Sequence, residues 1–202
     1  MITLYEFPAS GHCHKIRLML ALLELEYVSI VVDGNSQAHK SPEFLRMNPF
    51  GEVPVLTDDT VVLRDSQAIL YYLAQTYRTG TWMPADPGAA ANVIGWLSTA
   101  ANEVTRGSNM LRLHHKFGRA IDEPSATAIT KALFQMLENY LSQHTWLVGA
   151  APTIADIAMY PYLALAPEGQ WDLVPYPGVR AWLGRVRALP GYVGMPGMYE
   201  GT

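Results

Sequence analysis

The sequence is poor in cysteine, in charged side chains and in long apolar runs. Its 202 residues include one cysteine, Cys13, which excludes an internal disulfide and suits a reducing compartment. Charged residues make up 16% of the chain and the net charge is −4, which argues against nucleic acid as a partner. No segment reaches the roughly 18 apolar residues that a membrane span needs, and Glu24 and Glu26 interrupt the run after Ile16, unlike a signal sequence. We therefore expect a cytoplasmic protein that binds neither nucleic acid nor membranes.

Hydrophobic residues make up half of the chain, so a substantial core is expected. Residues 1–78 alternate between patterns typical of strands and of helices. The predicted elements are a strand over 2–7, a helix opening at Ser10-Gly11, a strand over 27–32, a short helix over 41–47, strands over 53–57 and 60–63, and a helix from Asp65 or Ser66. This order predicts a thioredoxin-like α/β domain.

A linker is predicted over residues 79–87, which contain Gly80, Pro84 and Pro87. Beyond it, residues 88–202 are predicted to be helical, except for the tail from Tyr192, which has no periodic signal. The pattern is clearest over 129–141. Further helices are predicted from Thr153 and over 179–189. We therefore expect a second domain that is entirely helical.

The turn at residues 8–13 joins the first strand to the first helix and is a candidate anion site. A helix start presents unpaired backbone N–H groups and the positive end of the helix dipole. Ser10 and Cys13 place a hydroxyl and a thiol there. Such groups could bind or activate an anion.

Three motifs resemble the cytosolic glutathione transferases. They are the strand followed by Ser10-x-x-Cys13-x-x-Ile16-Arg17, the segment 48–56 (NPFGEVPVL) followed by 63–70 (LRDSQAIL), and the capping-box motif at 152–158 (PTIADIA). The resemblance implies a thioredoxin-like N-terminal domain plus an all-helical C-terminal domain. It also implies glutathione as co-substrate, a role in detoxification, and a homodimer.

The resemblance assigns catalysis to Ser10, as in the serine-type members of the family. Its hydroxyl would hold the sulfur of glutathione as the thiolate, which is the reactive form. Lowering a thiol pKa by about two units requires roughly 2.7 kcal/mol, which one charge-assisted hydrogen bond and a helix dipole can supply. Two alternatives remain: Ser10 only caps the helix, or Cys13, with a pKa lowered by the helix start, is the reactive group.

Glutathione binding is assigned by the same resemblance to His39, Lys40, Glu52, Val53, Pro54, Asp65 and Ser66. A cis bond before Pro54 would turn the backbone of Val53 toward the cysteinyl part of glutathione. Asp65 and Ser66 suit its γ-glutamyl group. Glu52 departs from the family pattern, since many relatives carry Lys or Gln there.

The second substrate, a small hydrophobic electrophile, is expected between the first turn and the helices after the linker. The predicted contacts are Phe7, Pro8, His12, Met110, Leu113 and His114. No metal is expected, because His12 and His14 point to nearly opposite sides of a helix and the adjacent His114 and His115 are not expected to share an ion.

The sequence therefore predicts a glutathione transferase in which the glutathione thiolate attacks an electrophilic carbon. Two other functions stay open. One is glutathione-dependent thiol or peroxide redox chemistry on the same fold. The other is a non-catalytic binding protein that kept the fold, which Glu52 favours.

Overall fold

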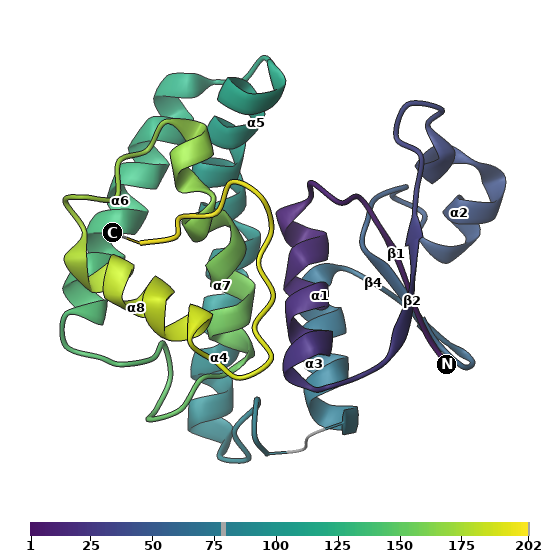
Figure 1. Ribbon diagram of the computed structural model, residues 1–202, viewed down its shortest axis with the longest axis horizontal. Coiled ribbons are helices and arrows are strands. Elements are labelled where there is room, and N and C mark those ends of the chain that lie inside the picture. Colours follow the sequence, from purple (N-terminus) through teal and green to yellow (C-terminus); the bar gives the residue numbers. More distant parts are fainter. Residues whose placement is uncertain (78–79, 202) are drawn as a thin grey trace.

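The computed structural model describes residues 1–77 and 80–201 (Figure 1). The elements of the N-terminal half are β1 (Ile2–Glu6), α1 (Gly11–Leu22), β2 (Tyr27–Val31), a 3₁₀ turn (Ala38–Lys40), α2 (Pro42–Met47), β3 (Val55–Asp58), β4 (Val61–Arg64) and α3 (Ser66–Tyr77). The strands form one sheet in the order β2-β1-β3-β4. β1 runs parallel to β2 and antiparallel to β3, and β3 pairs with β4 as an antiparallel hairpin.

The two faces of the sheet are covered by different helices (Figure 1). Ile2 and Leu4 of β1 belong to the large core that also holds α1 and α3. Tyr5, one residue along, points to the other face and packs edge-on against Phe44 of α2 at 6.3 Å. This alternation follows from the two-residue period of a strand.

All regular secondary structure in the described part of the C-terminal half is helical. Its elements are α4 (Pro87–Ala101), a π-helical turn (Thr105–Asn109), α5 (Met110–Phe117), α6 (Glu123–Leu141), α7 (Ile154–Ala164), a 3₁₀ turn (Ala166–Gly169) and α8 (Pro177–Arg187). The expected fold class, a mixed sheet with helices followed by an all-helical part, is confirmed. The predicted boundary between residues 78 and 79 lies outside the described residues.

Several predicted boundaries differ from the structure by one or two residues. β1 ends at Glu6, before Phe7, and β4 runs from Val61 to Arg64. β3 begins at Val55 rather than at residue 53, since Pro54 has no N–H to donate to a ladder. α8 begins at Pro177 rather than at residue 179, because a proline ring presets the dihedral angle of a first helical residue.

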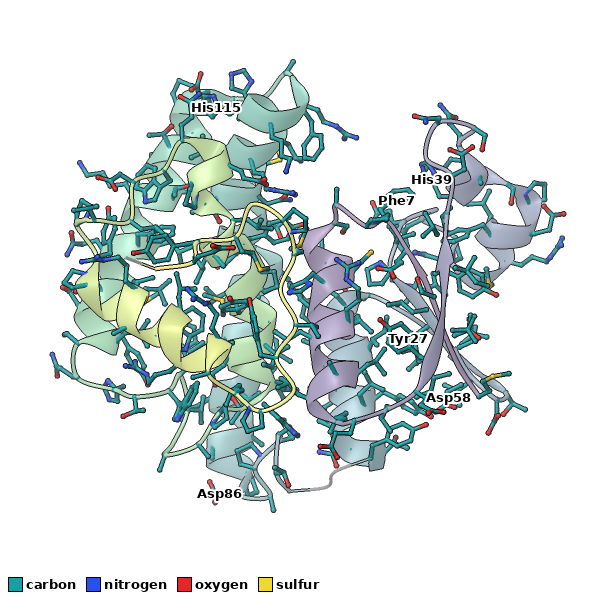
Figure 2. All side chains as sticks on the ribbon, viewed as in Figure 1. Phe7, Tyr27, His39, Asp58, Asp86 and His115 are labelled. Carbon is teal, nitrogen blue, oxygen red and sulfur yellow. The ribbon has the colours of Figure 1, made fainter. Side chains whose placement is uncertain are left out.

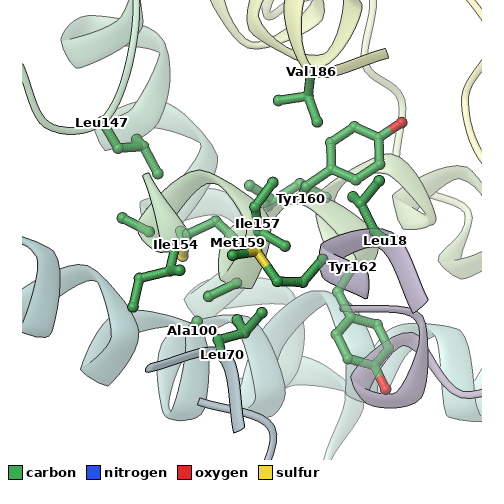
Figure 3. Close-up of a cluster of buried hydrophobic side chains, with 14 of the residues drawn as sticks. Leu18, Leu70, Ala100, Leu147, Ile154, Ile157, Met159, Tyr160, Tyr162 and Val186 are labelled. Atoms are coloured by element: carbon green, nitrogen blue, oxygen red, sulfur yellow. The ribbon is translucent and has the colours of Figure 1, made fainter. Parts of the chain in front are cut away.

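One core joins the two halves, and α7 runs through its centre (Figure 3). Every residue of α7 is buried. Figure 3 shows Leu18 of α1, Leu70 of α3 and Ala100 of α4 around it. The position of α1 is therefore fixed by the helical half as well as by the sheet.

The capping box predicted at the start of α7 is present. Thr153 Oγ1 accepts from the backbone N–H of Ala155 at 3.2 Å. The Asp156 carboxylate accepts from the N–H of Thr153 (2.9 Å), the N–H of Leu147 (3.1 Å) and Nε1 of Trp182 (2.9 Å). Asp156 thereby ties three segments to the central helix.

In the part of the chain that the structure describes, no helix combines the length and apolar character needed to cross a bilayer.

Candidate active site

Ser10 is the N-cap of α1, with extended backbone angles (φ −82°, ψ 124°). Its Oγ accepts a hydrogen bond from the backbone N–H of Cys13 at 3.3 Å. This bond uses only a lone pair of the hydroxyl oxygen, so the hydroxyl hydrogen can be donated elsewhere, and the Tyr162 side chain lies within its hydrogen-bonding reach. Capping the helix and donating to an anion are therefore compatible roles for one side chain.

Two arginines hold the turn that precedes Ser10. Arg17 of α1 donates to the backbone carbonyl of Pro8 at 3.0 Å and forms an ion pair with the buried carboxylate of Glu6. Arg112 of α5 donates to the carbonyl of Ala9 at 3.0 Å. The turn is thus fixed from its own helix and from the helical half.

Cys13 points into the core and is fully buried. Its sulfur accepts from the backbone N–H of Phe7 at 3.5 Å. Burial raises the pKa of the Cys13 thiol to about 11, despite hydrogen bonding from Ser10 and the Phe7 backbone. The alternative in which the helix start lowers this pKa is therefore not supported, because desolvation at this buried position acts in the opposite direction.

A first cavity, of about 230 Å³, lies beside the start of α3. It brings together Glu52, Val53, Pro54, Asp65 and Ser66 from the predicted glutathione-binding set. The Val53–Pro54 peptide bond is cis. Residues Asn48, Phe50, Arg64 and Gln67 add polar and aromatic contacts to the same cavity.

Asp65 and Ser66 form the start of α3. Asp65 has a positive φ of 71°, a conformation that is uncommon for residues other than glycine and often marks functional sites. Its Oδ1 accepts from the N–H groups of Gln67 (2.9 Å) and Ala68 (3.1 Å). The hydroxyl of Ser66 lies 3.5 Å from Nδ1 of His12.

His39 and Lys40 are not among the residues that line this cavity. The His39 ring packs edge-on against Phe7, with ring centroids 5.4 Å apart (Figure 2). Lys40 Nζ donates to the backbone carbonyl of Phe50 at 2.8 Å. Lys40 therefore contacts a residue of the cavity lining without lining the cavity itself.

A second cavity, of about 540 Å³, lies between the turn before α1 and the helical half. It is lined by Phe7, Ala9, Ser10, His12, Asn109, Arg112, Leu113, Phe117, Arg119 and Tyr162. Phe7, His12 and Leu113 were predicted for the second substrate. Pro8, Met110 and His114 were also predicted there but are not among the lining residues.

His12 lines both cavities, so the two sites meet at its ring. Burial, with a smaller effect from the charge of Lys15, lowers the pKa of His12 to about 3. The ring is therefore neutral at pH 7. It packs edge-on against Tyr162 with centroids 4.9 Å apart.

Sequence reasoning missed Tyr162 and Arg112. Tyr162 is 3% exposed, and burial raises its pKa to about 12, so its hydroxyl stays protonated. Arg112 is 2% exposed; its Nε donates to Glu168 at 2.6 Å, and its Nη2 has no hydrogen-bond partner among the described residues. No periodic pattern marks either residue: α7 is buried on every side, and the burial of Arg112 depends on distant segments.

Two family descriptions match the chain. "Glutathione S-transferase, N-terminal domain" matches residues 4–81, and "Glutathione S-transferase, C-terminal domain" matches residues 109–190. The disulfide-bond oxidoreductase YfcG of Escherichia coli (strain K12) is 32% identical over 94% of this chain and 92% of its own length.

Solved structures give the same result. A glutathione S-transferase from Xanthobacter autotrophicus Py2 superposes with a TM-score of 0.90 at 30% identity, over 98% of each chain. The glutathione transferase URE2P8 from Phanerochaete chrysosporium, solved with oxidized glutathione, has a TM-score of 0.84 at 27% identity, over 94% of this chain and 90% of its own. The chain belongs to the glutathione S-transferase family.

Proposed function

We propose that the protein is a serine-type glutathione transferase that joins glutathione to a small hydrophobic electrophile. The observation that carries this proposal is the place of Ser10. It lines the second cavity next to His12, where the first cavity begins, and its cap bond to Cys13 does not use its hydroxyl hydrogen. A sulfur held there would meet a donor from Ser10 at the start of α1.

Glutathione would occupy the first cavity. The backbone of Val53 would pair with its cysteinyl part, and Asp65 with Ser66 would hold its γ-glutamyl end at the start of α3. These residues line one cavity, and a structural neighbour was solved with oxidized glutathione. His39 and Lys40 would hold the glycine carboxylate of glutathione from outside the lining of this cavity.

The proposed reaction depends on a negative charge on the glutathione sulfur, which the site favours. The hydroxyl of Ser10 and the helix dipole stabilise the glutathione thiolate, while the thiol proton leaves to solvent. The thiolate sulfur then forms a bond to the electrophilic carbon, and the leaving group departs with its electron pair. Phe7, Leu113 and Phe117 offer apolar contacts to this second substrate.

A second candidate is glutathione-dependent disulfide or peroxide reduction. The similarity to a disulfide-bond oxidoreductase favours it. The burial and the raised pKa of Cys13 argue against that thiol as the redox group. In this version the sulfur of bound glutathione would attack the disulfide or peroxide, again beside Ser10.

The proposal extends to the organisation of the protein. We propose a glutathione-binding domain over residues 1–78 and a helical domain over residues 88–202, with the second substrate between them. We also propose that the protein is a homodimer in the cytoplasm and that no metal takes part in the transferase reaction. Sedimentation that showed only monomer would remove the dimer.

The test is steady-state turnover with glutathione and a chloronitrobenzene electrophile. Ser10→Ala should lower kcat/KM at pH 7 at least about tenfold, since it removes a charge-assisted bond worth over about 1.4 kcal/mol. Ser10→Thr keeps both hydroxyl and cap and should retain most activity. Ser36→Ala removes the hydroxyl of an exposed loop residue that bonds to Asp33, outside both cavities, and serves as the control.

The outcomes separate the three functions. Unchanged rates in Ser10→Ala would exclude Ser10 as the activating group. Turnover of a glutathione mixed disulfide, without activity on the electrophile, would favour the redox reaction. Retention on immobilised glutathione without either activity would indicate a binding protein.

A further inference from the structure

A cluster of three metal-binding side chains lies at the far end of the helical half, outside both cavities. It consists of His114 and His115, in the last turn of α5, and Glu123, the first residue of α6. Figure 2 shows His115 at the outer end of this half, away from Phe7. The side chains are 37%, 19% and 48% exposed, so an ion can reach them from solvent.

Two distances within the cluster are close to those between the ligands of a small divalent cation. Nε2 of His114 lies 3.7 Å from one carboxylate oxygen of Glu123, and Nε2 of His115 lies 3.4 Å from the other. Zinc ligands at their usual bond lengths of about 2.0–2.1 Å in a tetrahedron are about 3.3 Å apart. One ligand atom from each residue can be chosen so that all lie within 4.8 Å of one another.

The structure brings the two adjacent histidines closer together at this position than their spacing along a helix leads one to expect. The two rings meet edge-on, with centroids 4.8 Å apart and an interplanar angle of 70°. Successive helical residues point about 100° apart. Glu123, the first residue of α6, nevertheless lies close to both rings. The sequence alone did not show this proximity.

The conformation of the loop between α5 and α6 determines which ring nitrogen of His114 faces Glu123. Gly118 has a positive φ of 65°, and its N–H donates to the carbonyl of His114 at 2.9 Å. The chain then reverses, and the carbonyl of Arg119 lies 2.8 Å from Nδ1 of His114. A carbonyl can only accept, so Nδ1 carries a hydrogen, and Nε2 is the nitrogen that faces Glu123 and would serve as the metal ligand.

The position in the helix adds a favourable field. The two histidines lie at the C-terminus of α5, where the helix dipole is negative and favours a cation. The nearby Lys116 is already paired with Glu168, so its ammonium is turned to another partner.

We propose that His114, His115 and Glu123 form a zinc site with an open fourth position for water. Two imidazoles and one carboxylate favour zinc over magnesium or calcium, which prefer oxygen ligands. A bound ion would join the end of α5 to the start of α6 and fix the loop over residues 118–122. Arg119, in that loop, lines the second cavity, so zinc would position one residue of its wall.

The test is calorimetric titration of the full chain with Zn²⁺ in the absence of glutathione, whose thiol binds zinc itself. We expect saturable binding of one ion per chain. His115→Ala and Glu123→Gln should each raise the Kd at least about tenfold, since each removes a ligand. His144→Ala, at an exposed histidine outside the cluster, should leave the Kd unchanged. No saturable binding, or a Kd that is the same in all three variants, would overturn the proposal.

Co²⁺ gives a second readout that does not depend on activity. In the wild type a tetrahedral or five-coordinate site should give intense visible absorption bands. The bands should disappear in Glu123→Gln while the circular dichroism of the variant stays that of the wild type. Weak bands typical of octahedral, solvated Co²⁺ in the wild type would contradict the site.

Discussion

His14 predicts an acid instability that can be measured at a single position. Its ring is fully buried in α1, and neither ring nitrogen has a hydrogen-bond partner among the described residues. Burial, with a smaller effect from Arg17, lowers the pKa of His14 to about 3. His12 has a pKa of about 3 as well. An unfolded histidine has a pKa near 6.5, so the unfolded chain binds protons that the folded chain does not.

The stability from these neutral histidines is fully present above pH 6.5 and is lost as the pH falls toward 3. Between pH 7 and pH 5, each histidine should lower the free energy of unfolding by about 2 kcal/mol, and the pair by about 4 kcal/mol. Carboxylates contribute mainly below this window, where the unfolded groups titrate. Burial lowers the pKa of Lys15 to about 7, so Lys15 changes the free energy of unfolding mainly above pH 7.

Replacing His14 with leucine should halve this dependence. We expect His14→Leu to lose about 2 rather than 4 kcal/mol between pH 7 and pH 5. At pH 7 it should be as stable as the wild type or more stable, because two unpaired buried nitrogens disappear. Urea unfolding at a series of pH values measures both quantities, and His144→Leu, at an exposed histidine, is the control. If His14→Leu keeps the full wild-type slope, the reasoning from burial is refuted.

Three further predictions concern the core and the turn before α1. Asp156→Ala should lower the free energy of unfolding by about 3 kcal/mol or more, because three buried donors lose their acceptor; a loss under about 1 kcal/mol in denaturant titration would contradict this. Gly11→Ala places a Cβ 2.7 Å from the Tyr162 ring and should destabilise by about 1–3 kcal/mol, with partial recovery when Tyr162→Leu is added. Cys13 should react with iodoacetamide at pH 8 at least about 200-fold more slowly in the folded protein than after unfolding, since its pKa is about 11; equal rates would show an accessible thiolate.

The elements that local sequence patterns control were predictable. The long helix α6 follows from its apolar period, and the capping box at Thr153 and Asp156 follows from two residue types at the correct spacing. The start of α1 at Ser10 follows from proline, serine and glycine in sequence. In these cases the physical cause lies within a few residues of its effect.

The parts of the site that depend on distant contacts were not predictable. The burial of Cys13 depends on the sheet and on Phe7, and its raised pKa reverses what the helix start alone would favour. Arg112 reaches the turn before Ser10 from a separate helix. Glu123 meets His114 and His115 only because the chain reverses at Gly118. Each contact joins segments that local patterns treat separately.

The central claim is that the sulfur of glutathione rests as a thiolate against Ser10, and titration of the bound thiol tests it most directly. The ultraviolet absorption of the thiolate, followed against pH in the complex with glutathione, gives the pKa of that sulfur. We predict a value about two units below that of free glutathione in the wild type, and a return most of the way toward the free value in Ser10→Ala. A bound thiol with the pKa of free glutathione, or the same lowered pKa in both proteins, would contradict the account.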